Sequence, residues 1–240
     1  MQAGVTVDVS QVVRALNAAQ RRQLPYAMRN ALTNSARVAQ AEVQAEMVRA
    51  FANPSRFTLN SVYAKPAYLH DQTADVHFRD WAPKGTAAGK YLRPQIYGGP
   101  RDQKPFERLL QQTGAGRFFI PRPGMDPSTT GGMNRGQLVK VLSALRVMRD
   151  PHQNASRTRK SRGVRRNETY FAVQPGRPGL KAGVYRRGDD GDVAVILSAI
   201  RQPTYRKRFR FYEVSRDTMR AAFPEQFRRA MEHAMATARE

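Results

Sequence analysis

The chain has 240 residues, 41 of them Lys or Arg and 19 Asp or Glu, so its formal net charge is +22. This excess is far larger than solubility requires, and it predicts an anionic partner such as nucleic acid, an acidic neighbouring subunit or an anionic membrane surface. The chain contains no cysteine, which excludes disulfides, thiol nucleophiles and cysteine-based metal sites.

Membrane insertion is not expected, because the longest apolar run, at residues 193–200, is far shorter than a bilayer-spanning helix. The first ten residues, MQAGVTVDVS, lack the basic region and the apolar core of a signal peptide. We therefore expect no export.

Helical patterns dominate residues 1–52. Ser10 is a candidate N-cap for a first helix, and Pro25 marks a break or the first turn of a second helix. Residues 26–51 carry apolar and small side chains at helical spacing, which predicts one long amphipathic helix that ends before Pro54. The many alanines narrow one face of this helix and would admit a closely packed neighbouring helix, in this subunit or the next.

A β-hairpin is predicted next, with strands near residues 58–66 and 74–80. Residues 84–114 then form a Gly/Pro-rich segment, and its glycines and prolines exclude one continuous helix. Within this segment, residues 105–112 predict a short helix that Gly114 closes.

The Gly/Pro-rich segment is interpreted as an interaction loop. A long loop with many apolar anchors is usually ordered by packing, often against another subunit. The candidate residues for a subunit or partner interface are Tyr91, Leu92, Arg93, Ile96, Tyr97, Arg101 and Phe106.

A brief strand at residues 117–122 and a helix capped by Asn134 follow. Residues 149–168 lose every apolar period, so we interpret them as a basic insertion that is flexible when free. Three further strands are predicted at 170–174, 182–187 and 192–200.

The last predicted element is a helix over residues 213–237, in which Pro224 starts a second segment or kinks the first. A long N-terminal helix and a C-terminal helix packed on a small antiparallel sheet, with loop insertions, predict an α+β fold. We expect residues 1–240 to form a single domain.

Two basic clusters are candidates for phosphate contact. One lies in the predicted insertion. The other lies in TYRKRFRFY at 204–212, whose alternation is typical of a half-buried edge strand, with a base-stacking platform as the alternative. No sequence-reading motif is recognisable, so DNA contact would be independent of sequence, and a solvated face or a protein interface stays open. The candidate phosphate contacts are Arg157, Arg159, Lys160, Arg162, Arg165, Arg166, Arg206, Lys207 and Arg208.

Catalytic patterns are weak. GTAAGKY at 85–91 differs from a phosphate-binding loop in the spacing of its glycines and in Tyr91, which stands where a metal-binding Ser or Thr is needed. The four histidines lack metal-site spacing, and the acidic residues at 189–192 lie where a turn is expected. We expect no enzymatic activity and no metal or other cofactor.

The stretches KYLRPQIYGGPRDQKPFERLL at 90–110 and MNRGQLVKVLSAL at 133–145, with a C-terminal block at 170–176, 183–187 and 203–231, carry a family resemblance. They resemble the tail-completion or minor tail proteins of tailed bacteriophages and are similar to the minor tail protein Z group. The resemblance implies a structural protein of the head–tail junction or tail, part of a virion assembled in the bacterial host cytoplasm, without catalytic residues.

The partners expected from this resemblance are further copies of the chain in a ring, and portal, adaptor, tail-tube or terminator proteins. Packaged DNA is a further candidate. Two alternatives stay open: a nucleic-acid-binding protein without sequence preference, and a hydrolase or nuclease with an unrecognised site.

Overall fold

The computed structural model describes residues 2–4, 18–82, 85–128, 133–155, 169–188 and 190–237. The chain divides into two compact units where one domain was predicted. The first, which we name the helical unit, combines the chain up to Gly99 with the segment from Arg206 onward, and the second, the sheet unit, is the continuous segment 100–205. The predicted α+β class is confirmed, with long helices near both ends and small antiparallel sheets.

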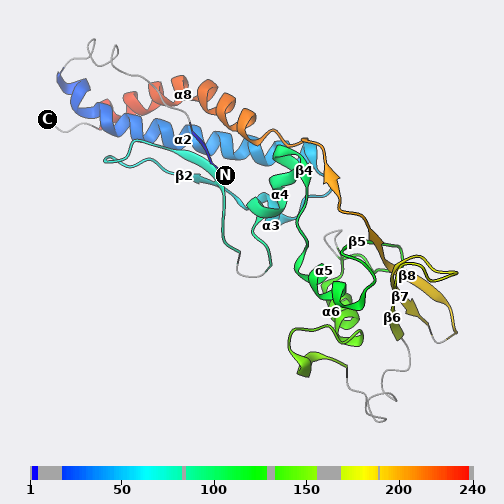
Figure 1. Ribbon diagram of the computed structural model, residues 1–240. Helices are drawn as coiled ribbons and strands as arrows, with labels where there is room; N and C mark the ends of the chain where they lie inside the picture. The colour runs from blue at the N-terminus through cyan, green and yellow to red at the C-terminus, as the bar shows by residue number, and fades with distance from the viewer. Residues whose placement is uncertain are drawn as a thin grey trace. The chain divides into compact units, whose positions relative to one another are not determined.

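The helical unit contains the two longest helices, α2 (Ala18–Ala50) and α8 (Phe211–Ala236), which run side by side (Figure 1). The long helix predicted at 26–51 is confirmed, but the break predicted at Pro25 is wrong. Leu24 and Ala27 on either side of this proline are both buried, so packing keeps the helix continuous although the proline donates no backbone hydrogen bond. Pro224 likewise lies inside α8, while Ser10 lies outside the described residues.

Small side chains form the seam between α2 and α8. Ala27 and Ala31 on α2 pack with Ala230 and Ala234 on α8, and all four are buried. Alanine keeps a helix face narrow and lets two backbones approach closely. The neighbouring helix that the alanine-rich face was predicted to admit is therefore α8 of the same chain.

A three-stranded antiparallel sheet completes the helical unit, in the order β1 (Gln2–Gly4), β3 (Asp75–Phe78) and β2 (Val62–Lys65). The β2–β3 pairing confirms the predicted hairpin. The first strand begins later than expected, because Ser55 caps a short helix, α3 (Arg56–Leu59), by accepting a hydrogen bond from the backbone N of Thr58.

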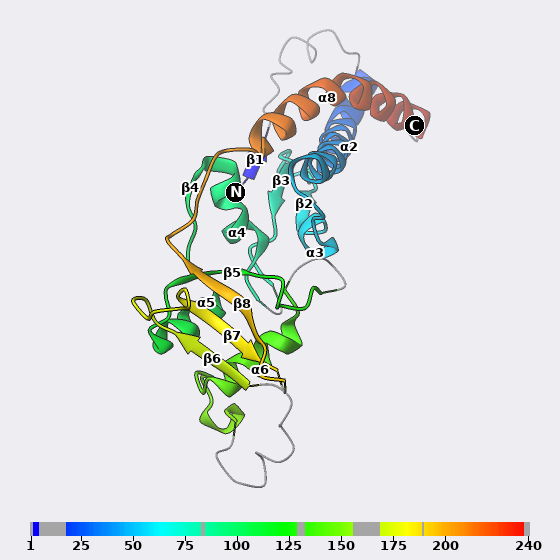
Figure 2. The same cartoon turned by 90° about the vertical axis from the view of Figure 1, so that its right-hand side faces the viewer.

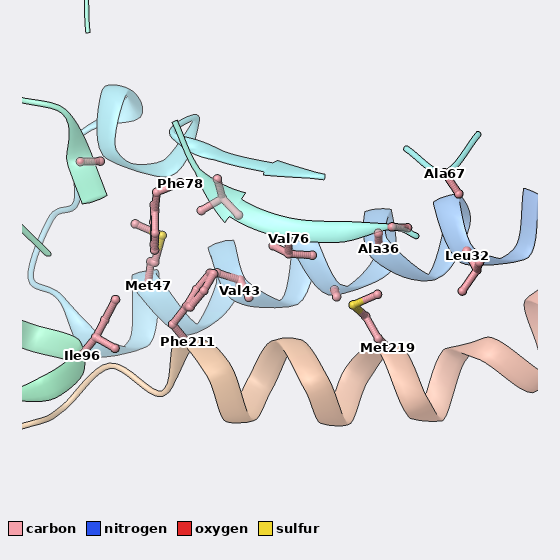
Figure 3. Packing of buried hydrophobic residues seen from close by; sticks show 14 of the residues in the cluster. Leu32, Ala36, Val43, Met47, Ala67, Val76, Phe78, Ile96, Phe211 and Met219 are labelled. Atoms are coloured by element: carbon pink, nitrogen blue, oxygen red, sulfur yellow. The ribbon is translucent and has the colours of Figure 1, made fainter. Parts of the chain in front are cut away.

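The core of the helical unit draws on both ends of the chain. β2 and β3 contact α2, while β1 contacts α8. Figure 3 shows Val43 and Met47 of α2, Val76 and Phe78 of β3, and residues of α8 packed together. The α8 residues in this cluster are Phe211 and Met219.

The sheet unit is built on a four-stranded antiparallel sheet, which Figure 2 shows (strands β5 to β8). Its strand order is β5 (Phe118–Pro121), β8 (Val193–Ile200), β7 (Gly183–Arg187) and β6 (Thr169–Val173). All four strands confirm the predictions to within a residue or so. A bulge interrupts the β7–β8 register between Val184 and Tyr185.

Two helices pack on this sheet, α5 (Pro105–Leu110) and α6 (Arg135–Ala144). Both were predicted, and Asn134 caps α6 as expected by accepting a hydrogen bond from the backbone N of Gln137 at 3.1 Å. The shared core is apolar and includes Phe106, Leu110, Val141, Leu142, Ile196 and Leu197. Two short 3₁₀ helices, η1 (Gln111–Thr113) and η2 (Pro151–Gln153), complete the unit.

The prediction of an edge strand at 204–212 is wrong over most of that stretch. Only β9 (Thr204–Tyr205) is a strand, paired with β4 (Gly99–Pro100), and α8 begins at Phe211. Phe209 is fully buried, as is Phe211, and the backbone N of Phe209 donates to Gln95 O at 3.0 Å. The aromatic residues of this stretch therefore belong to the core of the helical unit.

Within the described residues, no helix has the length and apolarity needed to cross a membrane.

The alanine seam predicts that added volume at Ala31 destabilises the helical unit. Ala31→Leu places three extra carbons where the side chain is fully buried, so we expect a loss of about 1–3 kcal/mol in the free energy of unfolding. Ala41→Leu makes the same change at an exposed position of α2 and should alter it by less than about 0.5 kcal/mol. Chemical denaturation followed by the helical circular-dichroism signal compares the two variants, and equal losses would contradict the seam.

Candidate interaction surfaces

Part of the predicted interaction loop is helical. Helix α4 (Ala88–Tyr97) belongs to the helical unit and ends at Gly98, whose φ of 80° lies in the left-handed region that favours glycine. The loop interpretation is therefore wrong for these residues. Their glycine and proline content was misleading because Pro94 is accommodated inside α4 and is itself buried.

Helix α4 is fixed in place by its apolar side chains. Leu92 and Ile96, both predicted to be interface residues, are buried in the core of the helical unit. Phe106, a third predicted interface residue, is buried in the core of the sheet unit. These three side chains hold the fold together and do not form an exposed surface.

The remaining residues predicted on α4 face solvent. Tyr97 is 56% exposed and Tyr91 is 39% exposed. Arg93 is exposed as well, and no described carboxylate lies within ion-pair distance of it. Arg93 and Tyr97 are four residues apart and lie on one side of α4, whereas Tyr91 lies on another side. We name these three exposed residues the α4 outer face.

Hydrogen bonds hold both tyrosines of this face in one position. The Tyr91 hydroxyl lies 2.8 Å from Thr58 Oγ1, and the Tyr97 hydroxyl lies 2.6 Å from the hydroxyl of Tyr212. Burial, together with the hydrogen bond to Tyr97, raises the pKa of Tyr212 to about 12, so the Tyr212 hydroxyl stays protonated at neutral pH. The exposed rings are thus presented in fixed orientations.

Arg101 was also predicted to be an interface residue, but its partner is internal. Its guanidinium forms two parallel hydrogen bonds with Glu107, Nη1 to Oε2 at 2.7 Å and Nη2 to Oε1 at 2.5 Å. The Glu107 side chain is fully buried and that of Arg101 is only 12% exposed. Such bidentate pairs fix the geometry of both side chains.

Glu107 ties three parts of the sheet unit together. Besides Arg101, its carboxylate accepts hydrogen bonds from the backbone N of Lys104 at 2.7 Å and of Phe119 at 3.0 Å. The sequence analysis did not single out this residue. Its signal was present, because Pro105 starts α5 and Glu107 lies three residues after Lys104, which is the position of the acidic residue in a capping box.

In the second basic cluster, residues 206–208, two of the three side chains already have partners within the chain. Lys207 pairs with Glu213 at 2.5 Å. Arg208 donates from Nε to Gln95 Oε1 at 2.7 Å, and its guanidinium lies 5.0 Å from the centre of the Phe51 ring. Arg206 is exposed, with no described carboxylate at ion-pair distance. The first basic cluster, at residues 157–166, lies outside the described residues, as does Asp189.

Metal ligands do not cluster in the part of the chain that the structure describes, where no group of three or more His, Asp or Glu side chains could hold an ion. No protein family, curated protein or solved structure matches the chain. The α4 outer face is thus defined by its geometry alone.

The buried pair of Arg101 and Glu107 predicts a pH-dependent contribution to stability. Burial acts to raise the pKa of Glu107, but hydrogen bonds from Arg101, Phe119 and Lys104 outweigh it, and the pKa lies below the usual value of 4.5. A carboxyl with a lowered pKa stabilises the fold above its unfolded-state value, and this stability is lost as the pH falls through the folded-state pKa.

Glu107→Gln leaves Arg101 without its counter-charge, so we expect a loss of about 3–5 kcal/mol at neutral pH. Glu213→Gln removes the partner of Lys207 at the surface, where the loss should be at most about 1 kcal/mol. Thermal unfolding between pH 7 and pH 3 measures both effects. The gap between wild type and Glu107→Gln should narrow as the pH falls below about 4.5, and a gap that widens would contradict the assignment.

Proposed function

We propose that the chain is a structural protein of a bacteriophage virion, at the head–tail junction or in the tail, where it completes the tail, neck or collar. It assembles as a homo-oligomeric ring that joins neighbouring virion proteins. The resemblance of residues 90–110, 133–145 and the C-terminal block to tail-completion and minor tail proteins supports this role.

The α4 outer face is the observation that carries the proposal. Leu92 and Ile96 anchor the helix in the core, and hydrogen bonds fix the rings of Tyr91 and Tyr97 on its solvent side. Tyrosine and arginine are enriched where proteins bind one another, and rigid side chains lose little conformational entropy on binding. A surface of this kind suits a partner protein.

Further aromatic side chains of the helical unit are exposed. Trp81 is 74% exposed, and Phe57 and Tyr63 are also accessible. A partner that covered such a ring would gain hydrophobic free energy. The exposed rings therefore support a helical unit that is completed by association.

The net charge of +22 suits acidic neighbours in such an assembly. A ring forms when one patch of a subunit binds a different patch on the next copy. We propose portal, adaptor, tail-tube or terminator proteins as the adjoining components. The chain acts by binding, and we propose no catalytic step for it.

Size-exclusion chromatography with light scattering tests ring formation. The wild-type chain should form one closed oligomer at moderate salt. Arg93→Glu reverses a charge on the α4 outer face without breaking a described contact, so it should shift the oligomer towards monomer by at least about tenfold in dissociation constant, the usual cost of a like-charge contact.

Arg220→Glu is the matched control, because Arg220 is exposed on α8 and has no described ion pair. It makes the same change in net charge and should leave the oligomer intact. A wild-type chain that stays monomeric and binds no virion component would contradict the proposal. Equal weakening of the oligomer by the two variants would also contradict it, because the α4 outer face would then make no specific contribution to the subunit contact.

A further inference from the structure

A cationic groove of 660 Å³ lies within the helical unit, between α2, α8 and the segment that follows β2. Its lining includes three arginines, Arg29, Arg37 and Arg229, with Tyr68 on the segment after β2. Neither Asp nor Glu contributes to the lining. The volume is within the range of about 300–1,000 Å³ that is typical of ligand sites.

The positive charge in the groove is poorly neutralised. Arg29 donates from Nε and Nη2 to Asn30 Oδ1 at 3.2 and 2.9 Å, which orients its guanidinium and leaves its charge intact. Arg37 is exposed and has no described carboxylate within ion-pair distance.

Arg229 shares its carboxylate. Glu225 contacts Arg229 at 2.6 Å and Arg228 at 2.8 Å, and Arg228 has a second carboxylate partner in Glu232 at 2.6 Å, so two carboxylates serve the two guanidiniums. Hydrogen bonds from Arg228 and Arg229 lower the pKa of Glu225 to about 2, so this carboxylate is ionised at neutral pH and offsets the charge of Arg229. The net positive charge of the groove at neutral pH therefore comes from Arg29 and Arg37.

An exposed aromatic ring lies beside these cations. Tyr68 is 47% exposed, and its ring stacks on that of His70 with centroids 5.6 Å apart and an interplanar angle of 19°. The segment that carries it is held in place, because the backbone N of Ala67 donates to Thr33 Oγ1 at 3.1 Å and that of Tyr68 donates to Asp71 O at 2.8 Å. The ring is thus a fixed platform.

We propose that this groove binds single-stranded nucleic acid, with phosphodiester groups on Arg29, Arg37 and Arg229 and a base stacked on Tyr68. A positive groove with an aromatic platform is the combination that binds unpaired strands without sequence preference. From residue 29 to residue 37 is eight residues of α2, about 12 Å along the helix axis, so the two guanidiniums can meet different phosphates of one strand.

Single-stranded nucleic acid explains the groove better than an acidic protein segment does. The carboxylates of an acidic segment would pair with the arginines but would make no contact with the exposed ring of Tyr68. An unpaired base can stack on that ring. A base held in a duplex cannot stack there, because its faces are already covered. The inference does not depend on the virion role, since the groove does not involve the α4 outer face.

Fluorescence anisotropy of a labelled oligothymidylate with the full chain measures the binding. Arg29→Gln/Arg37→Gln removes two phosphate contacts, and the affinity should fall at least about tenfold while the log–log salt slope falls by about 1.4. Arg22→Gln/Arg220→Gln removes the same charge from exposed helix positions outside the groove and should change the affinity by less than about twofold.

The control decides between a site and general attraction to a basic protein. Equal losses in the two double variants would overturn the proposal. Arg29→Lys/Arg37→Lys keeps the charge and should recover most of the affinity. Unchanged thermal unfolding of every variant excludes a folding defect as the cause of a loss.

Tyr68 provides the second test. Tyr68→Ala should weaken binding of the single strand by at least about fivefold, because a stacked base contributes about 1–3 kcal/mol, whereas Tyr68→Phe should not. A 5-iodouracil oligonucleotide should photo-crosslink to Tyr68, with the site read by mass spectrometry. Crosslinks confined to other residues would overturn the proposal, and so would a poly-glutamate peptide whose binding depends on Arg29 and Arg37 as strongly as that of the oligonucleotide.

Discussion

The pairing of α2 with α8 is the contact on which the helical unit depends. The two helices come from opposite ends of the chain, and the seam of Ala27, Ala31, Ala230 and Ala234 lets them approach closely. At the other end of the pair, Arg210 donates to Glu46 at 3.0 Å. The hydrogen bond from Arg210 is the main cause that lowers the pKa of the buried Glu46 carboxyl, so this junction stays ionised at neutral pH.

Because of this pairing, the helical unit is made of two segments that are far apart in the sequence. The helical unit is not complete until residues 206–240 are present, whereas the sheet unit is one continuous segment with its own core. The last stretch supplies Phe209 and Phe211, whose rings lie 6.1 and 4.8 Å from that of Phe78. Closing a core through contacts so distant in sequence is slow compared with local packing. The α4 outer face and the groove both belong to the helical unit, so both need the C-terminal segment to be packed in place.

Local patterns predicted the elements of secondary structure well, because periodicity, caps and turns depend on near neighbours in sequence. The long helix, the β2–β3 hairpin, the Asn134 cap and the strands of the sheet unit all followed from such signals. Predictions of exposure were weaker. Leu92 and Ile96 have the residue types of interface anchors and of core residues alike, and only the tertiary packing places them in the core. The groove was missed because Arg29, Arg37 and Arg229 each look like an ordinary solvated helix position until α2 and α8 are paired.

The excess of positive charge is distributed unevenly between paired and unpaired side chains. Lys207, Arg210 and Arg228 have carboxylate partners in the structure, whereas Arg37 and Arg93 have none among the described residues. Arg37 lies in the groove and Arg93 on the α4 outer face, whereas Arg206 and Arg220, which also have no described carboxylate partner, lie outside both places. Each of the two proposed surfaces therefore holds an arginine that an anionic group could meet.

Quantitative mass spectrometry of purified mature phage particles tests the proposed role most directly. If the chain is a ring component of the neck or tail, it is present in every particle at a fixed integer ratio to the portal subunit, and washing at high salt does not remove it. Its absence from the particles, or a ratio that varies between preparations, would contradict a structural role in the virion.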